Sequence, residues 1–198
     1  MSSNYKRWDL IYKKYPLNEL GWELGRPRDI LVEYMNKEMI RPGKALDICC
    51  GAGTNTIYLA QEGFEVNGID ISKTALKIAK EKAQKQNVNV SFSIQSFVNL
   101  AFKDELFDFI FDMGCFHHVV PKDRETFIKG TYRTLKNNGT LMLTAFSQKN
   151  GSAWNHFTKT QLTELFSDHF SITNIRHLSS IEGDGYTRHF YTLLMKKK

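Results

Sequence analysis

The chain has 198 residues, 41% of them hydrophobic and 24% charged, which is the composition of a globular protein with one buried core. Its 27 basic and 21 acidic residues give a net charge of +6, an excess that favours an anionic partner but is spread along the chain. No apolar run reaches the roughly 18 to 20 residues that span a bilayer, and the three cysteines lack zinc-site spacing, so we expect a cytoplasmic protein without membrane partner or bound metal.

Residues 1–40 are predicted to form a helical flap. Apolar side chains at helical spacing mark a first helix that Pro16 ends, and a second such helix runs to about Met39. The residues on the two inner faces are Trp8, Ile11, Tyr12, Tyr15, Leu31, Tyr34 and Met35.

Residues 41–150 alternate between short apolar runs and helical stretches. The expected strands are Ala45 to Cys49, Glu65 to Asp70, Val90 to Ile94, Phe107 to Met113 and Thr140 to Phe146. The expected helices are Asn55 to Glu62, Lys73 to Gln86 and Arg124 to Leu135. Strands joined by helical crossovers form a parallel sheet covered on both faces.

Residues 151–198 change this pattern. A capping box at Thr158 and Gln161 starts a helix, and strands at Phe170 to Leu178 and Tyr186 to Met195 follow, joined by a short loop that makes them antiparallel. We therefore predict a single α/β domain over residues 1–198, built on a doubly wound, seven-stranded, mostly parallel sheet that ends in an antiparallel β-hairpin.

The turn after the first strand carries the most specific motif. Gly51 and Gly53 allow the backbone to approach a ligand closely, and the helix that follows presents free N–H groups. Asp47, at the carboxyl end of the strand, is suited to receive an ammonium group.

The second strand ends in another acidic residue, Asp70, which lies 17 residues beyond Gly53. A carboxylate here can accept both hydroxyls of a ribose, which indicates a nucleoside-type ligand. Thr56 replaces the third glycine of the dinucleotide fingerprint, so a hydride-transfer cofactor is not favoured.

In these features the sequence resembles the class I S-adenosylmethionine-dependent methyltransferases, over roughly residues 5 to 195. It is most similar to the thiopurine and tellurite-resistance type of small-molecule methyltransferases. The residues that carry this likeness are Gly21 to Pro27, Phe107 to Val119 and Thr144 to Phe146. The resemblance implies transfer of a methyl group from S-adenosylmethionine, leaving S-adenosylhomocysteine, to a small-molecule acceptor.

The resemblance also implies a set of site residues. The segment around Trp22 would fold over the cofactor, Phe97 would face the adenine, and the loop from Met113 to His118 would lie between methyl donor and acceptor. The expected cofactor-binding residues are Trp22, Asp47, Gly51, Ala52, Gly53, Asp70, Ile71, Ser96, Phe97 and Met113. The expected substrate-binding residues are Arg26, Cys115, His118, Phe146 and Arg188. Two positions depart from the family pattern, since Cys49 replaces a glycine and Ser96 an acidic residue.

Methyl transfer from a sulfonium depends mainly on positioning, but an oxygen or amine acceptor also needs a base. His117 and His118 are the catalytic candidates; adjacent side chains are expected to diverge, so one faces the substrate and the other bonds a backbone carbonyl. Cys115 is expected in the pocket wall, because no covalent intermediate is needed. Sulfur, selenium, tellurium, arsenic, nitrogen and oxygen acceptors all remain open, with a thiol or chalcogen compound favoured.

Two other functions are weighed against this one. The net charge suggests an RNA substrate, but no Asn-Pro-Pro-Tyr-like motif follows the fourth strand and no RNA-binding module is present, so nucleic acid is not expected. Ser96 at the adenine position suggests a cofactor-binding protein with weak catalysis.

Overall fold

The computed structural model describes residues 3–198, with side chains from Lys6 onward, and its contacts divide the chain into two units. Unit 1 contains the residues up to Ser96 together with Glu182–Tyr186. Unit 2 contains Phe97–Ile181 and Thr187–Lys198. The single domain predicted above stays a prediction.

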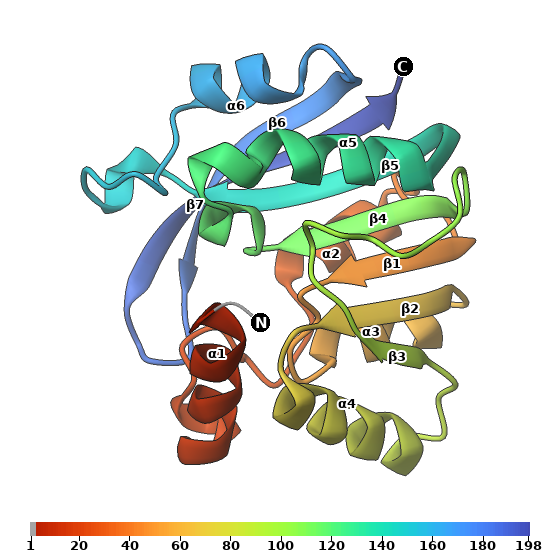
Figure 1. Ribbon diagram of the computed structural model, residues 1–198, viewed down its shortest axis with the longest axis vertical. Coiled ribbons are helices and arrows are strands. Elements are labelled where there is room, and N and C mark those ends of the chain that lie inside the picture. The colour runs from red at the N-terminus through yellow and green to blue at the C-terminus, as the bar shows by residue number, and fades with distance from the viewer. Residues whose placement is uncertain (1–2) are drawn as a thin grey trace. The chain divides into compact units, whose positions relative to one another are not determined.

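Unit 1 is built on three parallel strands with helices beside them (Figure 1). Its elements are α1 (Ser3–Lys14), the 3₁₀ turn η1 (Leu17–Glu19), α2 (Asp29–Asn36), β1 (Lys44–Ile48), α3 (Thr54–Gln61), β2 (Glu65–Asp70), α4 (Lys73–Lys85) and β3 (Ser91–Ile94). Asp47 of β1 pairs in register with Gly68 of β2, so that both strands end at one edge. The glycine turn and Asp70 leave the sheet at this edge.

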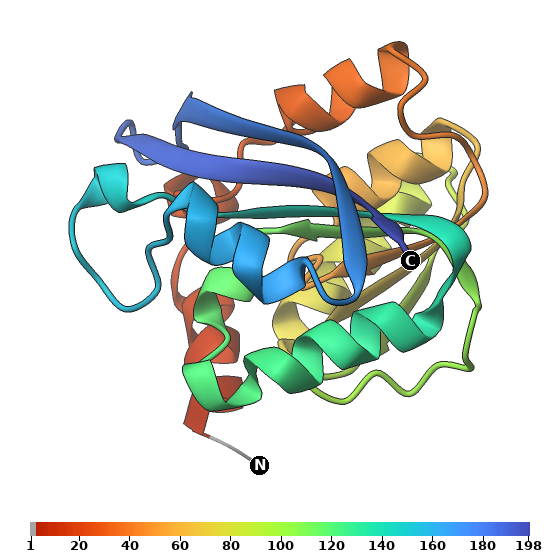
Figure 2. The same cartoon turned by 90° about the horizontal axis from the view of Figure 1, so that it is seen from above.

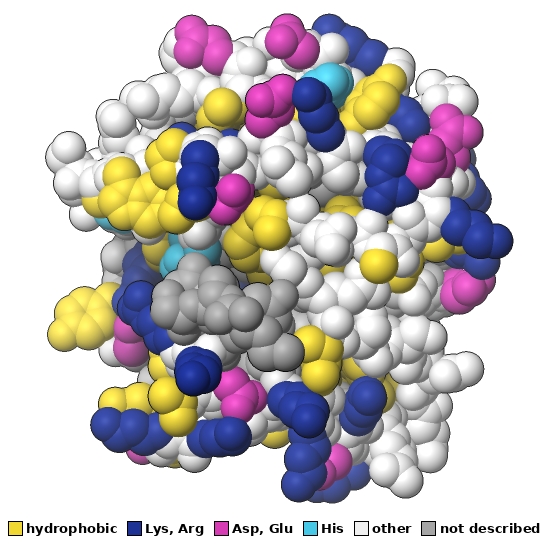
Figure 3. All heavy atoms as spheres, in the orientation of Figure 1, with side chains coloured by type: hydrophobic (Ala, Val, Ile, Leu, Met, Phe, Trp, Pro, Cys, Tyr) yellow, Lys and Arg dark blue, Asp and Glu magenta, His cyan; other side chains and the backbone are white. Residues whose placement is uncertain are grey.

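Helix α4 shows how the basic residues are accommodated. It buries Ala75, Leu76, Ala79 and Ala83 and presents most of its lysines to solvent. Figure 3 shows Lys and Arg side chains scattered among acidic ones over the face in view. These lysines therefore form a solvated outer face of the helix.

Unit 2 combines a parallel strand pair with the antiparallel hairpin. Its elements are β4 (Phe107–Met113), η2 (Phe116–His118), η3 (Pro121–Asp123), α5 (Arg124–Thr134), β5 (Leu135–Phe146), η4 (Gln148–Asn150), α6 (Lys159–Phe166), β6 (Phe170–Ile181) and β7 (Thr187–Lys197). Strand β4 runs parallel to β5, whereas β7 is antiparallel to both β5 and β6. Figure 2 shows α5 and α6 beside these strands.

The seven strands follow the order β3-β2-β1-β4-β5-β7-β6 in one mixed sheet, which confirms the predicted α/β fold with its C-terminal hairpin. In unit 2 the core between sheet and helices is aromatic. The ring of Phe116 lies 5.2 Å from that of Phe127 and 5.1 Å from that of Phe166. Within residues 3–198, no helix is both long and apolar enough to cross a membrane.

Candidate active site

The turn between β1 and α3 adopts left-handed backbone angles at three positions. Gly51 has φ of +55° and Gly53 of +77°, as the glycine motif predicts. Cys49 has φ of +56°, although a side chain at such an angle costs about 1 to 2 kcal/mol. Cys49, which stands where the family pattern has glycine, therefore strains this turn.

Gly53 allows close packing at the start of α3. A Cβ atom there would lie 2.8 Å from the Cβ of Ala79 on α4, which is closer than two carbons can approach. The residue therefore has to be glycine for reasons of space as well as of backbone angle. Ala52, between the two glycines, is buried.

The two strand-end carboxylates of unit 1 are held by hydrogen bonds. The Thr56 hydroxyl donates to Asp47 at 2.5 Å. The N–H groups of Gly51 and Ser72 donate to the two oxygens of Asp70, at 3.0 and 2.7 Å. Burial raises the pKa of Asp70 above its usual value, although these backbone bonds favour the charged form. Unit 1 thus brings together Asp47, the glycine turn and Asp70, with Ile71 half-buried next to it.

Tyr12 of α1 is a site residue that was predicted only as part of the inner face of the first helix. Its hydroxyl accepts a hydrogen bond from the Trp22 indole at 2.9 Å. A Cβ atom on Gly51 would lie 2.5 Å from that hydroxyl, so Tyr12 lies directly against the glycine turn. Burial of the Tyr12 side chain raises the pKa of its phenol above the usual value.

The segment after α1 also contacts the first turn of α3. Glu23 accepts hydrogen bonds from the Thr54 hydroxyl at 2.5 Å and from the Gly25 N–H at 3.1 Å. Lys82 of α4 donates to the same Thr54 hydroxyl at 2.6 Å. Within unit 1 the segment after α1 therefore lies against the glycine turn, and Trp22 belongs to this segment with 40% of its surface exposed. That the segment covers a bound cofactor stays a prediction.

The two residues expected at the adenine follow β3. Ser96 is half-buried in unit 1. Phe97 is half-buried in unit 2, where its ring lies 6.2 Å from that of Phe127 in an edge-on arrangement.

In unit 2, a buried acidic residue lies near the end of β4, next to the half-buried Met113 that ends the strand. Asp112 accepts hydrogen bonds through Oδ1 from the N–H groups of Cys115 at 2.7 Å and Phe116 at 3.4 Å. Its Oδ2 has no hydrogen-bond partner among residues 3–198, and burial raises its pKa from 3.8 to about 7. We did not predict a role for Asp112, although a carboxylate inside an apolar strand is a signal visible in the sequence.

The two histidines of η2 differ in burial but do not diverge. The two rings lie 4.4 Å apart, because both residues belong to one 3₁₀ turn, so the expected divergence is wrong. His117 is buried and has an Nδ1 without partner within residues 3–198, so it does not bond a carbonyl through this atom as expected. Burial, followed by the nearby His118 and His156, lowers its pKa well below 6.5.

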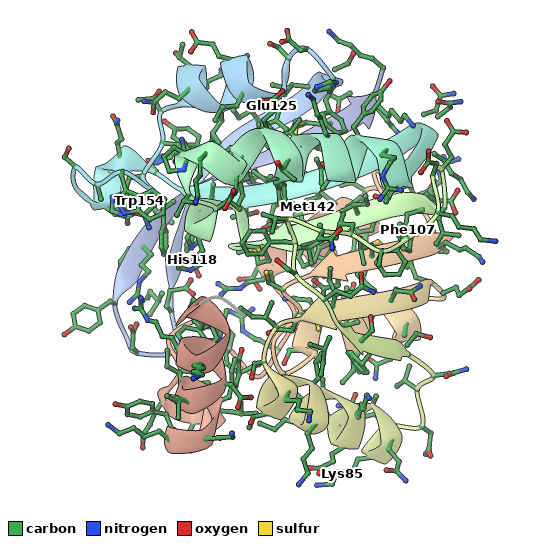
Figure 4. All side chains as sticks on the ribbon, in the orientation of Figure 1. Lys85, Phe107, His118, Glu125, Met142 and Trp154 are labelled. Carbon is green, nitrogen blue, oxygen red and sulfur yellow. The ribbon has the colours of Figure 1, made fainter. Side chains whose placement is uncertain are left out.

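His118 is exposed. Figure 4 shows it beyond β4, at the opposite end of that strand from Phe107. Solvent therefore reaches His118, whereas His117 is buried behind it.

The predicted substrate-binding residues lie in different surroundings. Arg26, in unit 1, is exposed and forms an ion pair with Asp29. In unit 2, Cys115 is buried, whereas Arg188 is half-buried in β7 opposite Ser180 of β6.

Phe146, at the end of β5, is also half-buried. It stacks on His117 at 3.8 Å and on Phe190 at 5.3 Å. Within unit 2 the structure thus brings Phe146 together with the histidine pair in one aromatic wall.

A pocket of about 340 Å³ in unit 2 adjoins this wall. Its lining residues are Arg124, Trp154, His156, Phe157, Gln161, Glu164 and Leu165. The His156 ring lies edge-on to Phe146 at 5.5 Å. The Arg124 guanidinium lies 4.7 Å from the centre of the Phe157 ring and donates to the carbonyl of Trp154 at 3.1 Å. This pocket was not predicted, because its lining residues carry no sequence motif.

Comparison with known proteins shows which family the chain belongs to. Residues 45–139 match the family model described as a methyltransferase domain. An uncharacterized methyltransferase of Schizosaccharomyces pombe is 34% identical over 109 residues, which cover 55% of this chain and 75% of the relative.

Solved structures share the fold over most of the chain. A SAM-dependent methyltransferase of Methanosarcina mazei is 25% identical, with a TM-score of 0.74, and the match covers 87% of this chain and 98% of that one. A structure described under the conversion of a disulfide bond into a thioacetal group during echinomycin biosynthesis has a TM-score of 0.89 at 18% identity, over 98% and 92% of the two chains. The chain therefore belongs to the class I methyltransferases, enzymes that use S-adenosylmethionine as methyl donor.

Proposed function

We propose that S-adenosylmethionine binds across the carboxyl-terminal edge of β1 and β2 in unit 1, where Asp47, the glycine turn and Asp70 converge. This convergence is the observation that carries the proposal. Asp70 is held by two backbone N–H groups and accepts the ribose hydroxyls, and Asp47 receives the ammonium group of the methionyl end. Gly51 and Gly53 give the turn its left-handed backbone angles and allow Tyr12 and Ala79 to pack closely against it.

Cofactor contacts beyond these are supported by resemblance and by position. Trp22 covers the glycine turn together with Tyr12, Ala52 lies in that turn and Ile71 follows β2. Ser96 and Phe97, after β3, and Met113, the last residue of β4, are assigned to the cofactor by the resemblance alone. When bound, the cofactor supplies an electrophilic methyl group on a sulfonium. The protein residues supply orientation and exclude water, which can together contribute roughly 7 to 11 kcal/mol to such a displacement.

For the methyl acceptor we propose a small molecule that reacts through a thiol or another chalcogen, bound at the wall of His117, His118 and Phe146. Burial keeps His117 uncharged, and His118 is the exposed candidate for taking a proton. A thiol has a pKa near 8.5 and thus needs only a weak base, unlike an alcohol. The structure described for thioacetal formation, which shares this fold, is a precedent for sulfur chemistry in another protein.

The remaining substrate-binding predictions belong to the same proposal. Arg188 and Arg26 would hold an anionic part of the acceptor, and Cys115 supports the wall from its buried position. The pocket next to His156 has room for a part of the acceptor that does not react.

A titration with S-adenosylhomocysteine tests the cofactor site. We expect calorimetry to show binding at micromolar or lower concentration to the wild-type chain, and a loss of at least about 100-fold for Asp70→Ala, because a carboxylate that accepts two hydroxyl groups contributes about 3 kcal/mol. Asp168→Ala, at an exposed position of unit 2, is the matched control and is expected to bind normally. Unchanged binding by Asp70→Ala would rule out the proposed site.

The acceptor is tested separately with the wild-type enzyme and labelled S-adenosylmethionine. The panel pairs a thiol, selenite and tellurite with a primary amine and a catechol. Transfer to the sulfur, selenium or tellurium compounds but not to the amine or catechol supports the proposal. Transfer to the amine or catechol alone contradicts the proposed acceptor while leaving the cofactor site intact.

A further inference from the structure

The turn of the C-terminal hairpin, Glu182–Tyr186, belongs to unit 1 and contacts the segment from Leu20 to Arg28. The Arg28 guanidinium donates to both carboxylate oxygens of Glu182, at 2.7 and 2.8 Å. Only 9% and 3% of these two side chains are exposed. The two residues are 154 positions apart, so this buried ion pair joins distant parts of the chain.

Gly183 brings the backbones of the two segments together next to this ion pair. Its N–H donates to the carbonyl of Gly21 at 2.8 Å. A Cβ atom on Gly183 would lie 2.9 Å from the carbonyl oxygen of Glu23 and 3.0 Å from that of Leu20. Any side chain at Gly183 would therefore push the hairpin turn away from the segment.

A continuous set of contacts leads from this ion pair to the glycine turn. The Arg28 guanidinium also donates to the carbonyl of Trp22 at 3.0 Å. The indole of Trp22 donates to the Tyr12 hydroxyl at 2.9 Å, and that hydroxyl lies directly against Gly51. The hairpin turn, through Arg28, thus fixes the backbone of Trp22. The Trp22 side chain then holds Tyr12 against the glycine turn.

We propose that Arg28 and Glu182 are positioning residues for the cofactor: their ion pair holds the Leu20–Arg28 segment, and through Trp22 the Tyr12 side chain, in the arrangement that covers the glycine turn. The proposal rests on the cofactor site proposed above. A buried ion pair suits this task, because the loss of one partner leaves an uncompensated charge that the closed arrangement cannot accommodate. The fraction of molecules in the binding-competent arrangement then falls, and the apparent dissociation constant rises in proportion.

Calorimetric titration of the full chain with S-adenosylhomocysteine tests this inference. Glu182→Gln removes the charge with little change of volume, and we expect its dissociation constant to rise about tenfold, as a tenfold loss of the competent population requires. Gly183→Ala displaces the turn without changing either charged residue and is expected to have an effect of the same direction. Glu65→Gln, which breaks an exposed ion pair with Lys44 in the same unit, is the matched control and should bind as the wild type does.

A double-mutant cycle separates positioning from a merely structural role. Residues that do not touch have additive effects unless they act through one another. We therefore expect Tyr12→Phe/Glu182→Gln to bind no more weakly than the weaker of its two parents, with circular dichroism confirming that each variant is folded. Should Glu182→Gln fail to fold, the same cycle is run with Gly183→Ala.

Three results would overturn the inference or locate the error. Wild-type affinity in folded Glu182→Gln and Gly183→Ala, or additive losses in the cycle, means that the ion pair only stabilises the fold. If these variants bind normally while Asp70→Ala does not bind, the positioning role fails and the cofactor site stands. If Asp70→Ala also binds normally, both proposals fail.

Discussion

At the scale of single residues, the buried Asp112 leads to a prediction about how the stability of the fold depends on pH. Its carboxyl group is fully buried, and burial raises its pKa to about 7. The native state keeps this proton up to about pH 7, whereas the unfolded chain releases it near pH 4. The stability contributed by the protonated group is therefore complete below pH 4 and is lost as the pH rises through 7.

Asp112→Asn replaces the protonated acid with a neutral group of the same size and should remove this dependence. From pH 5 to pH 8, we expect the free energy of unfolding of the variant to rise relative to the wild type by up to about 3 kcal/mol. Urea denaturation at both pH values measures this difference. Asp168→Asn, at an exposed position, is the control. Parallel pH profiles of Asp112→Asn and wild type would show that Asp112 is charged in the native state.

The positions and backbone angles of single residues were predictable from the sequence where local patterns determine them. The backbone angles of Gly51 and Gly53 and the strand-end position of Asp70 follow from the local pattern of strand, turn and helix. The ion pair of Arg28 with Glu182 has no such pattern, because its partners are brought together only by tertiary packing. The arrangement of the histidine pair was missed because the 3₁₀ turn that contains both residues was not predicted.

At the scale of elements, α1 lies against the turn between β1 and α3, and this contact leads to a second prediction. Gly51→Ala places a methyl group 2.5 Å from the Tyr12 hydroxyl and also strains a residue with φ of +55°. Gly25→Ala has a similar φ of +68° but no atom within 4 Å of the added methyl, so its effect measures the cost of the backbone strain alone. That strain costs about 1 to 2 kcal/mol.

We expect Gly51→Ala to lower the free energy of unfolding by more than Gly25→Ala, by a further 1 to 3 kcal/mol or so, as overpacking does. In the Tyr12→Phe background, which lacks the clashing hydroxyl, the two alanine substitutions should cost about the same. Chemical denaturation of the four variants measures both differences. An equal cost for both alanines in the wild-type background would mean that α1 does not press on the glycine turn.

Elements were predictable to the extent that local sequence determines their ends. The bounds of β2 and β4 are as predicted, and the capping box of Thr158 and Gln161 starts α6. Strand β5 begins at Leu135 instead of Thr140, directly after α5. Lys136 to Gly139 are polar or glycine, and the pairing with β4 shifts register across them, from Leu135 opposite Phe107 to Thr140 opposite Phe109. Pairing with a distant strand leaves no local pattern.

At the scale of the whole molecule, the net charge of +6 leaves an anionic ligand as an alternative. The lysines of α4 are spread over its exposed side, and ion pairs such as Lys77 with Glu81 offset part of their charge. A nucleic-acid surface would need basic residues concentrated along one face. Apart from the net charge, the distribution of basic residues therefore gives no support to an RNA substrate.

Thermal unfolding compares the cofactor with RNA on the entire chain. A ligand that binds only the native state at 100 times its dissociation constant stabilises it by about 2.7 kcal/mol. For a chain of this length, each kcal/mol raises the melting temperature by roughly 2 to 4 °C, so S-adenosylhomocysteine should raise it by about 5 to 10 °C. Asp70→Ala should show no such rise, and neither should random RNA added to the wild type at low salt. A rise with RNA but none with S-adenosylhomocysteine would instead indicate a protein whose principal ligand is nucleic acid.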